Sequence, residues 1–103
     1  MGNESEADMQ ERKFTVRNKA GIHCRPSGVI LNTIKKEFPN HYIEIASPNG
    51  LTLEANSILS LISLELSCGT EAILRAEGID EEIAVKKLGD LLETEFDFPP
   101  LNK

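Results

Sequence analysis

The alternation of hydrophobic and polar residues along the chain predicts four strands. In the first, Phe14 and Val16 fall on one face while Lys13, Thr15 and Arg17 fall on the other, as in a strand with one buried face. A "PNG" typical of a hairpin turn separates the second strand from the third. The predicted strands are "RKFTVRN" (12–18), "HYIEIAS" (41–47), "LTLEA" (51–55) and "TEAILRAEG" (70–78).

Between the strands the spacing of hydrophobic residues changes to three and four, which predicts helices. We expect the first helix to begin at Pro26, because a proline lacks the N–H that has no acceptor at the first helical position. Pro39 disfavours a helical conformation at Phe38 and therefore ends this helix. The residues at helical spacing are Val29, Ile30, Thr33, Ile34 and Phe38.

A second helix is predicted over residues 57–66, with Asn56 and Ser57 as candidates for its N-cap and Cys68-Gly69 beyond its end. It carries more hydrophobic side chains than one buried stripe holds. We therefore expect some of them to face outward as a small apolar patch suited to a transient protein interface. They are Ile58, Leu59, Leu61, Ile62, Leu64 and Leu66.

The third helix is predicted in "DEEIAVKKLGDLLETEF" (80–96), which has acidic residues in its first turn. The side chains expected to face inward are Ile83, Val85, Leu88, Leu91 and Leu92.

The resulting order of elements is strand, helix, strand, strand, helix, strand, helix. This order predicts an α+β fold, an open-faced β-sandwich with a four-stranded antiparallel sheet covered on one face by three helices. We expect one domain over residues 12–94. Residues 1–11 are expected to form an acidic disordered tail, and residues 95–103 a short C-terminal extension.

Composition limits the class of protein. With two cysteines in 103 residues, Cys24 and Cys68, a disulfide scaffold is not expected, so both are interpreted as reduced thiols of a cytoplasmic protein. No hydrophobic run approaches the roughly 20 residues that span a bilayer, and the start of the chain does not have the pattern of a secretory signal. We therefore expect no membrane insertion. No metal signature, glycine-rich phosphate loop or dinucleotide motif is present, so no metal or cofactor is expected.

The distribution of charge is more informative than its sum. The net charge of −6 argues against general binding of nucleic acids. Residues 1–11 carry four acidic and no basic side chains, whereas residues 12–36 carry no acidic ones and seven basic ones: Arg12, Lys13, Arg17, Lys19, Arg25, Lys35 and Lys36. This basic segment is either a run of solvated side chains or an attraction for an anionic ligand or an acidic partner.

The basic segment contains "AGIHCRPSG" (20–28), which places His23 just before a predicted helix. A neutral imidazole nitrogen is a nucleophile near neutral pH. The helix N-terminus favours an anion at this place, and the fork of donors on Arg25 suits phosphate oxygens. Together they would stabilise a phosphoryl group on His23.

Three other interpretations of these residues are open. In the first, His23 is an ordinary solvated side chain, and His41, at the head of a strand, has the same simple interpretation. A Cys24–His23 hydrolase is the third, because a thiol at a helix N-terminus can have a lowered pKa. Adjacent residues, however, rarely have the geometry of a nucleophile and its base.

"GIHCRPSG", followed about 30 residues later by "NSILSLISL", resembles HPr, the histidine-containing phosphocarrier family of the bacterial phosphoenolpyruvate-dependent phosphotransferase system. Members commonly read G-[LI]-H-[AT]-R-P-A at the first site. The resemblance covers residues 12–93, including the order of elements and the "PNG" hairpin. Here Cys24 and Ser27 replace the usual small residues such as Ala or Thr.

The resemblance implies that His23 is phosphorylated on Nδ1 by enzyme I and passes the phosphoryl group to the A domain of a sugar-specific enzyme II. The protein would be a monomeric covalent carrier rather than a stand-alone catalyst. Arg25 would bind the phosphoryl oxygens, assisted by the backbone amides of Cys24 and Arg25. Ser57 matches the serine that a dedicated kinase or phosphorylase modifies. The partner-binding residues would be Ser27, Gly28, Leu59 and Ile62.

A second function remains open at this point. A regulatory or nitrogen-branch module of the same fold would act by docking to other proteins, for instance through phosphorylated Ser57, rather than in sugar uptake. A pure docking module has no need of His23, so the presence of this imidazole favours the carrier.

Overall fold

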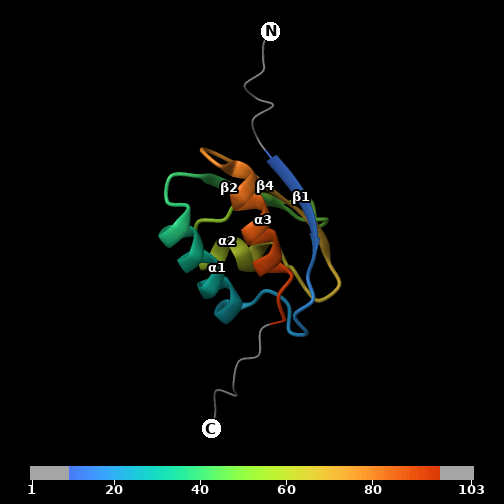
Figure 1. Ribbon diagram of the computed structural model, residues 1–103. Coiled ribbons are helices and arrows are strands. Elements are labelled where there is room, and N and C mark those ends of the chain that lie inside the picture. Colours follow the sequence, from blue (N-terminus) through green and yellow to red (C-terminus); the bar gives the residue numbers. More distant parts are fainter. Residues whose placement is uncertain (1–9, 96–103) are drawn as a thin grey trace.

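The four predicted strands pair into one antiparallel sheet in the order β1-β4-β2-β3. The computed structural model describes residues 10–95. In Figure 1 the three helices lie on one side of the sheet, so the predicted open-faced β-sandwich is confirmed. The elements are β1 (Gln10–Thr15), α1 (Cys24–Glu37), β2 (Tyr42–Ala46), β3 (Thr52–Glu54), α2 (Ile58–Ser63), β4 (Glu71–Glu77) and α3 (Glu81–Leu92). The parts of the expected tail and extension in residues 1–9 and 96–103 lie outside the described residues.

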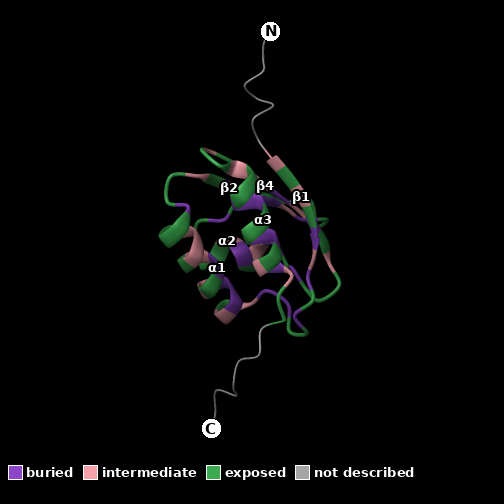
Figure 2. Cartoon of the chain, in the orientation of Figure 1, coloured by how far each residue is buried: buried purple, intermediate pink, exposed green. Residues whose placement is uncertain are grey.

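The alternation in each strand places its hydrophobic side chains under the helices (Figure 2). Phe14 of β1 and Leu74 of β4 are almost completely buried, and Val16 continues the same face beyond the strand. From the helices, Ile30, Leu61 and Leu88 complete one continuous core. The opposite face of the sheet carries mostly polar and charged side chains, with Ile73 and Ala46 half-buried among them, which explains why all three helices cover the same side.

Both predicted turn signals around the second and third strands are confirmed. In the "PNG" hairpin, Gly50 has a positive φ of 98°, a conformation that glycine adopts without steric cost. The Ser47 N–H donates to the Leu51 carbonyl oxygen at 2.8 Å and closes the hairpin. Helix α1 ends at Glu37, directly before Phe38 and Pro39, as expected.

Several predicted boundaries differ from the structure. Strand β1 begins at Gln10, two residues before the expected start of the domain. Helix α1 begins at Cys24, so Pro26 is its third residue rather than its first. This is tolerated because the first N–H groups of a helix have no acceptor in the preceding turn. Helix α2 ends at Ser63, because Glu65 takes a left-handed conformation (φ 55°).

One residue that was predicted to face the core from α3 lies on the surface instead. Ile83 was expected to face the core, but 59% of its surface is exposed. Ala84 takes the buried position instead, together with Val85, Leu88 and Leu92, while Leu91 is half-buried against the core. At about 100° per residue, positions 84, 85, 88 and 92 lie within one arc around the helix axis. Ile83 falls outside this arc, on the side of α3 that faces solvent.

Arg12 connects the first strand to the last helix. Its guanidinium donates to the Lys86 carbonyl oxygen at 2.9 Å and forms ion pairs with Asp90 and Glu93 at 2.8 and 3.1 Å. The hydrogen bond from Arg12 lowers the pKa of Asp90 below its ordinary value. The side chain lies across Gly89, where a Cβ atom would come within 2.5 Å of the Arg12 Cδ.

None of the helices in residues 10–95 has both the length and the hydrophobicity that a membrane span requires.

The close approach of Arg12 to Gly89 predicts energetic coupling between the two residues. In an Arg12→Ala background, Gly89→Ala should raise the free energy of unfolding by about 0.8–1 kcal/mol, because alanine is the better helix former. In the wild type this gain should be lost, because the new methyl group displaces the guanidinium from its partners. Urea denaturation of the four proteins measures the coupling, which we expect to reach at least about 0.5 kcal/mol. Equal effects in both backgrounds would contradict this account.

Candidate phosphoryl-transfer site

The loop before α1 is fixed to the loop after α2. The Ile22 N–H donates to the Leu66 carbonyl oxygen at 2.8 Å, and the Asn18 side-chain amide donates to the Gly21 carbonyl oxygen at 2.8 Å. Gly21 has a φ of 76°, and a Cβ atom there would lie 2.7 Å from the Leu66 oxygen. Only glycine fits both the conformation and the space. This loop sets the position of His23, the next residue but one.

His23 is the N-cap residue of α1 rather than a residue of an independent loop. Its backbone is extended (φ −106°, ψ −158°), and its carbonyl oxygen accepts the hydrogen bond from the Ser27 N–H at 2.9 Å that begins the helix. Its side chain makes no capping hydrogen bond and is half-buried. The imidazole therefore lies at the positive end of a 14-residue helix without being used to cap it.

The first turn of α1 has the composition of an anion site. It contains no acidic side chain. Cys24 and Arg25 contribute the first two N–H groups, since Pro26 has none, and such groups point out of the helix end. The Arg25 side chain is half-buried and Cys24 is exposed.

The seven basic residues of the sequence segment do not form one surface. Arg12 is bound to α3, as described above. Lys35 and Lys36 lie in the last turn of α1, about 17 Å along the helix from its first residue. Of the seven, only Arg17, Lys19 and Arg25 belong to the loop before His23 or to the turn after it.

Ser27 and Gly28 occupy different environments. The Ser27 side chain is completely buried, and its hydroxyl has no hydrogen-bond partner among the described residues. The resemblance implied that Ser27 contacts a partner, but in this structure its side chain is not accessible at the surface. Gly28 is half-buried, and a Cβ atom there would meet nothing within 4 Å.

A groove brings Gly28 and Ser57 together from separate elements. Its walls come from α1 and from the segment that begins α2, and the residues lining it are Gly28, Leu31, Asn32, Lys35, Asn56, Ser57 and Ile58. The sequence alone does not indicate this proximity, because about 30 residues separate the two segments.

Ser57 is the N-cap of α2, as predicted, because its Oγ accepts the Ser60 N–H at 3.1 Å. The same hydroxyl donates to the Ser60 Oγ at 3.0 Å, and Ser60 in turn donates to the Asn56 Oδ1 at 3.2 Å. Ser57 is half-buried at the rim of the groove.

Helix α2 exposes part of its hydrophobic surface, as expected from its surplus of apolar residues. Leu59 is 73% exposed, and Ile62 and Ile58 are exposed beside it, while Leu61 is buried. We call Ile58, Leu59 and Ile62 the α2 patch. Ile58 belongs to it because residues 58 and 62 are one helical turn apart.

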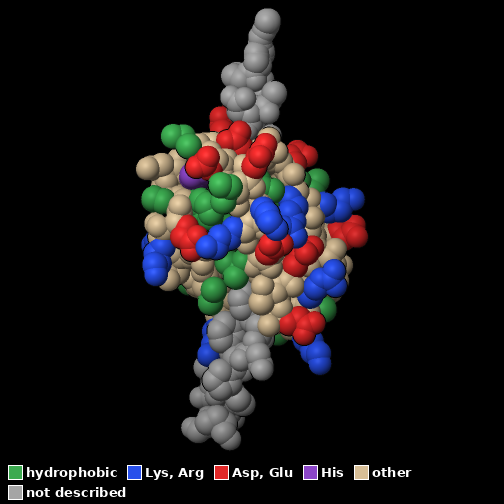
Figure 3. Space-filling view, viewed as in Figure 1, with side chains coloured by type: hydrophobic (Ala, Val, Ile, Leu, Met, Phe, Trp, Pro, Cys, Tyr) green, Lys and Arg blue, Asp and Glu red, His purple; other side chains and the backbone are tan. Residues whose placement is uncertain are grey.

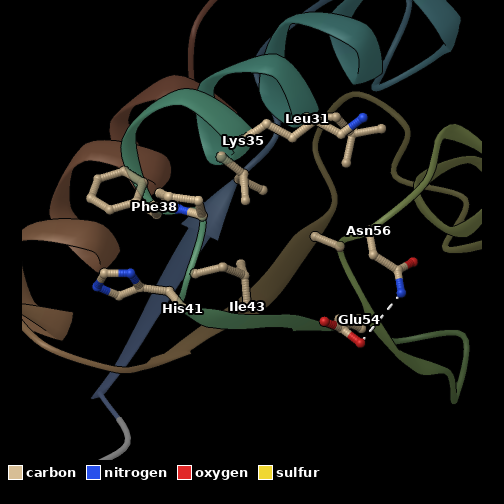
Figure 4. A pocket seen from close by; sticks show the side chains of 10 residues that line it. Leu31, Lys35, Phe38, His41, Ile43, Glu54 and Asn56 are labelled. Carbon is tan, nitrogen blue, oxygen red and sulfur yellow. Dashed lines mark hydrogen bonds between the residues drawn. The ribbon is translucent and has the colours of Figure 1, made fainter.

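The second histidine lies elsewhere in the fold. The His41 Nε2 contacts the Ile79 carbonyl oxygen, and the ring stands edge-on to Phe38 with 5.3 Å between centroids. It lines a cavity of about 220 Å³ between α1 and the β2–β3 hairpin (Figure 4). Asn56 and Glu54, joined by a hydrogen bond of 3.3 Å, lie at its other end. His41 is therefore packed into the fold rather than fully solvated, as the sequence had led us to expect for it.

The remaining candidate chemistry is not assembled in residues 10–95. The two cysteines are free thiols, and the Cys68 Sγ lies 3.7 Å from the Arg17 carbonyl oxygen. Within this range, no group of three or more His, Cys, Asp or Glu side chains is arranged to hold a metal ion.

Comparisons with known proteins identify a family for this chain. The family model described as "PTS HPr component phosphorylation site" matches residues 10–94. The chain is 34% identical over 88 residues to the phosphocarrier protein HPr of Xylella fastidiosa, covering 85% of this chain and 96% of that protein. It is 33% identical over 87 residues to the HPr-like protein Crh of Bacillus subtilis, covering 84% of this chain and 99% of the other.

Solved structures give the same result. HPr-C-His from Thermoanaerobacter tengcongensis superposes with a TM-score of 0.72 at 37% identity, over 82% of this chain and 91% of the other. Phosphocarrier protein HPr from Bacillus anthracis superposes with a TM-score of 0.74 at 26% identity, over 82% and 96%. The family model and these relatives both extend over nearly all of the described residues, and the chain therefore belongs to the HPr family of phosphocarrier proteins of the phosphotransferase system.

Proposed function

We propose that His23 is the residue that accepts and donates the phosphoryl group. The observation that carries this proposal is the position of its imidazole at the N-terminus of α1 without a capping bond. In the accepting step, Nδ1 forms a bond to phosphorus while the bond between phosphorus and the donor enzyme breaks. The reverse exchange passes the group onward. The protein is then a covalent carrier in the cytoplasm rather than a stand-alone catalyst.

The surroundings of His23 suit such a group. A phosphoryl group on the ring adds negative charge at the positive end of α1, where the first N–H groups and the helix dipole favour it. Arg25, in the same turn, supplies a planar fork of donors for its oxygens. The backbone amides of Cys24 and Arg25 are the corresponding backbone donors.

The partners we propose are enzyme I as donor and the A domain of a sugar-specific enzyme II as acceptor, each meeting a monomer of this protein. The names of the relatives support phosphoryl transfer in general: the chain matches 23% of the multiphosphoryl transfer protein of Escherichia coli at 33% identity. The exposed α2 patch and Gly28 beside the α1–α2 groove supply a docking surface. Of the expected docking residues, Leu59 and Ile62 fit this role best.

Ser57 is the proposed regulatory site, modified by a serine kinase or phosphorylase. Its half-buried hydroxyl lies at the rim of the groove and next to the α2 patch. A phosphate would add about −1.5 to −2 charges there at neutral pH. The new charge would change the docking surface without requiring a change of fold.

A regulatory function is the second candidate, and one observation favours it. The HPr-like protein Crh of Bacillus subtilis is about as similar to this chain as the phosphocarrier of Xylella fastidiosa. Its solution structure, described as that of the catabolite repression HPr, superposes with a TM-score of 0.61 at 31% identity. A module of this kind would act by docking rather than by transfer through His23.

His23→Ala should abolish labelling by phosphoenolpyruvate and enzyme I while leaving the fold intact, because His23 is a half-buried N-cap that makes no capping bond. Intact mass after incubation measures the transfer, and circular dichroism checks the fold. Cys24→Ala is the matched control and should transfer at nearly the wild-type rate. The label should be lost in acid and survive alkali, as a phosphoramidate does. Full labelling of the His23 variant would exclude this residue.

Arg25→Lys should slow the transfer about tenfold or more although the charge is kept. The planar fork is lost, and one hydrogen bond to a charged group is worth about 1.5–3 kcal/mol. Rapid-quench kinetics with phosphorylated enzyme I would measure the rate. Lys19→Arg, a change on the exposed loop before the site, serves as the control. Unchanged kinetics in the Arg25 variant would reduce Arg25 to a surface charge.

Ser57→Asp should leave the melting temperature within a few degrees of wild type but slow phosphorylation of His23 by enzyme I. An acidic group at an N-cap is compatible with the helix, whereas a negative charge beside the docking surface repels an acidic partner. Thr52→Asp, on the exposed strand β3, is the control for charge alone. If both variants reacted at the wild-type rate, Ser57 would be only a helix cap.

A further inference from the structure

A second hydrophobic surface lies where β4 passes into α3. Ile79 is 83% exposed and Ile83 is 59% exposed, and neither is part of the α2 patch. Acidic residues surround them on the same turn and on the end of β4. We call Glu77, Ile79, Asp80, Glu81, Glu82 and Ile83 the β4–α3 corner.

The corner lies at the end of the molecule opposite to His23. Strand β4 ends beside the start of β2, since Glu77 pairs with Tyr42. This is the end at which α1 finishes, and α1 extends 14 residues, or about 21 Å, back to its first turn. A protein bound at the corner would therefore leave the His23 site accessible.

The backbone of the corner is fixed by contacts with the rest of the fold, so the exposure of Ile79 is not a result of a loose loop. The His41 Nε2 contacts the Ile79 carbonyl oxygen from the neighbouring connection. Gly78 has a φ of 148°, and a Cβ atom there would lie 2.8 Å from the His41 ring. The backbone on both sides of Ile79 is thus fixed, and its side chain is directed into solvent.

The carboxylates of the corner are not neutralised by ion pairs within residues 10–95. The two lysines further along α3 are engaged elsewhere, Lys86 with Asp90 and Lys87 with Glu37. Glu81 and Glu82 have a simple role, because acidic residues in the first turn stabilise a helix. Stabilising the helix does not account for the exposure of Ile79 and Ile83 among these acidic side chains. Figure 3 shows hydrophobic side chains beside acidic ones toward the end of the molecule where the described chain begins.

We propose that the β4–α3 corner is a docking surface for a basic amphipathic segment of another protein. Ile79 and Ile83 would bury against hydrophobic side chains of the partner, and the four carboxylates would pair with its Lys or Arg side chains. A second copy of this chain that binds through its own corner is disfavoured, because it would bring like charges together. Residues 1–9 are disfavoured as well, since they carry three acidic and no basic side chains.

This proposal is independent of phosphoryl transfer and can be tested separately from it. The probe is a 14-residue helical peptide of leucine and lysine, added to the ¹⁵N-labelled full-length protein and followed by NMR. We expect the amide signals of residues 77–83 to shift most. A peptide with glutamate in place of lysine should leave these signals unchanged. Raising the salt concentration from 50 to 300 mM should weaken the binding of the lysine peptide several-fold.

Variants separate this surface from the α2 patch. Ile79→Ser with Ile83→Ser should weaken binding of the lysine peptide about tenfold or more, because both lose their hydrophobic contact. The matched control is Leu59→Ser with Ile62→Ser. This control and His23→Ala should both bind the lysine peptide as tightly as the wild type does. The melting temperature of the corner variant should stay nearly unchanged, because both side chains are exposed.

Three results would overturn the proposal. The first is equal binding of the lysine peptide to the corner variant and the control. The second is a shift of residues 77–83 on concentrating the protein alone, which would identify a second copy as the occupant. The third is a shift of the same signals in Phe96→Ser with Phe98→Ser, without peptide, which would identify the chain's own C-terminal segment.

Discussion

The burial of one face of a four-stranded sheet is the constraint on which the other features of this protein depend. Each strand alternates, so only one face is hydrophobic, and all three helices must cover it. Helices α1 and α2 therefore become neighbours although a hairpin separates them in sequence. Their proximity creates the groove that joins Gly28 to Ser57. The proposed docking surface is thus a consequence of the way in which the core is formed.

The same constraint positions His23. Helix α1 is held on the core by Ile30, and the loop before it is held by the bond between Ile22 and Leu66. Together these contacts leave little freedom to the N-cap residue between them. A carrier residue must present one ring nitrogen to two different partners in turn, and a fixed N-cap backbone with an unused imidazole suits this need.

The charges of the molecule are divided between its ends in a way that the net charge of −6 conceals. The turn that begins α1 has one basic residue, Arg25, and no acidic one, while the turn that begins α3 is acidic. Each of these turns lies close to exposed hydrophobic side chains in the sequence or in space. In this arrangement, the two ends of one small domain would prefer partners of opposite charge.

The sequence by itself determined the class of fold, the order of the elements and the candidate site, because each depends on local patterns. Alternation revealed the strands, and the proline after Phe38 and the cap at Ser57 marked helix ends correctly. The sequence also singled out His23. A histidine followed by Arg and Pro at the start of a helix is a local pattern, and the resemblance to a family supported its interpretation.

Only the tertiary structure decided which side chains reach the surface together. Ile83 was misplaced because a hydrophobic period cannot distinguish neighbouring rows of a helix. The complete burial of Ser27 was not visible in the sequence either, because burial of a side chain depends on which distant residues pack against it. The basic residues that lie in one segment of the sequence are separated in space, since Arg12 is paired with Asp90 and Glu93, 78 and 81 residues away. Such contacts between distant segments leave no trace in a local pattern, and they decide which charges remain available to a partner.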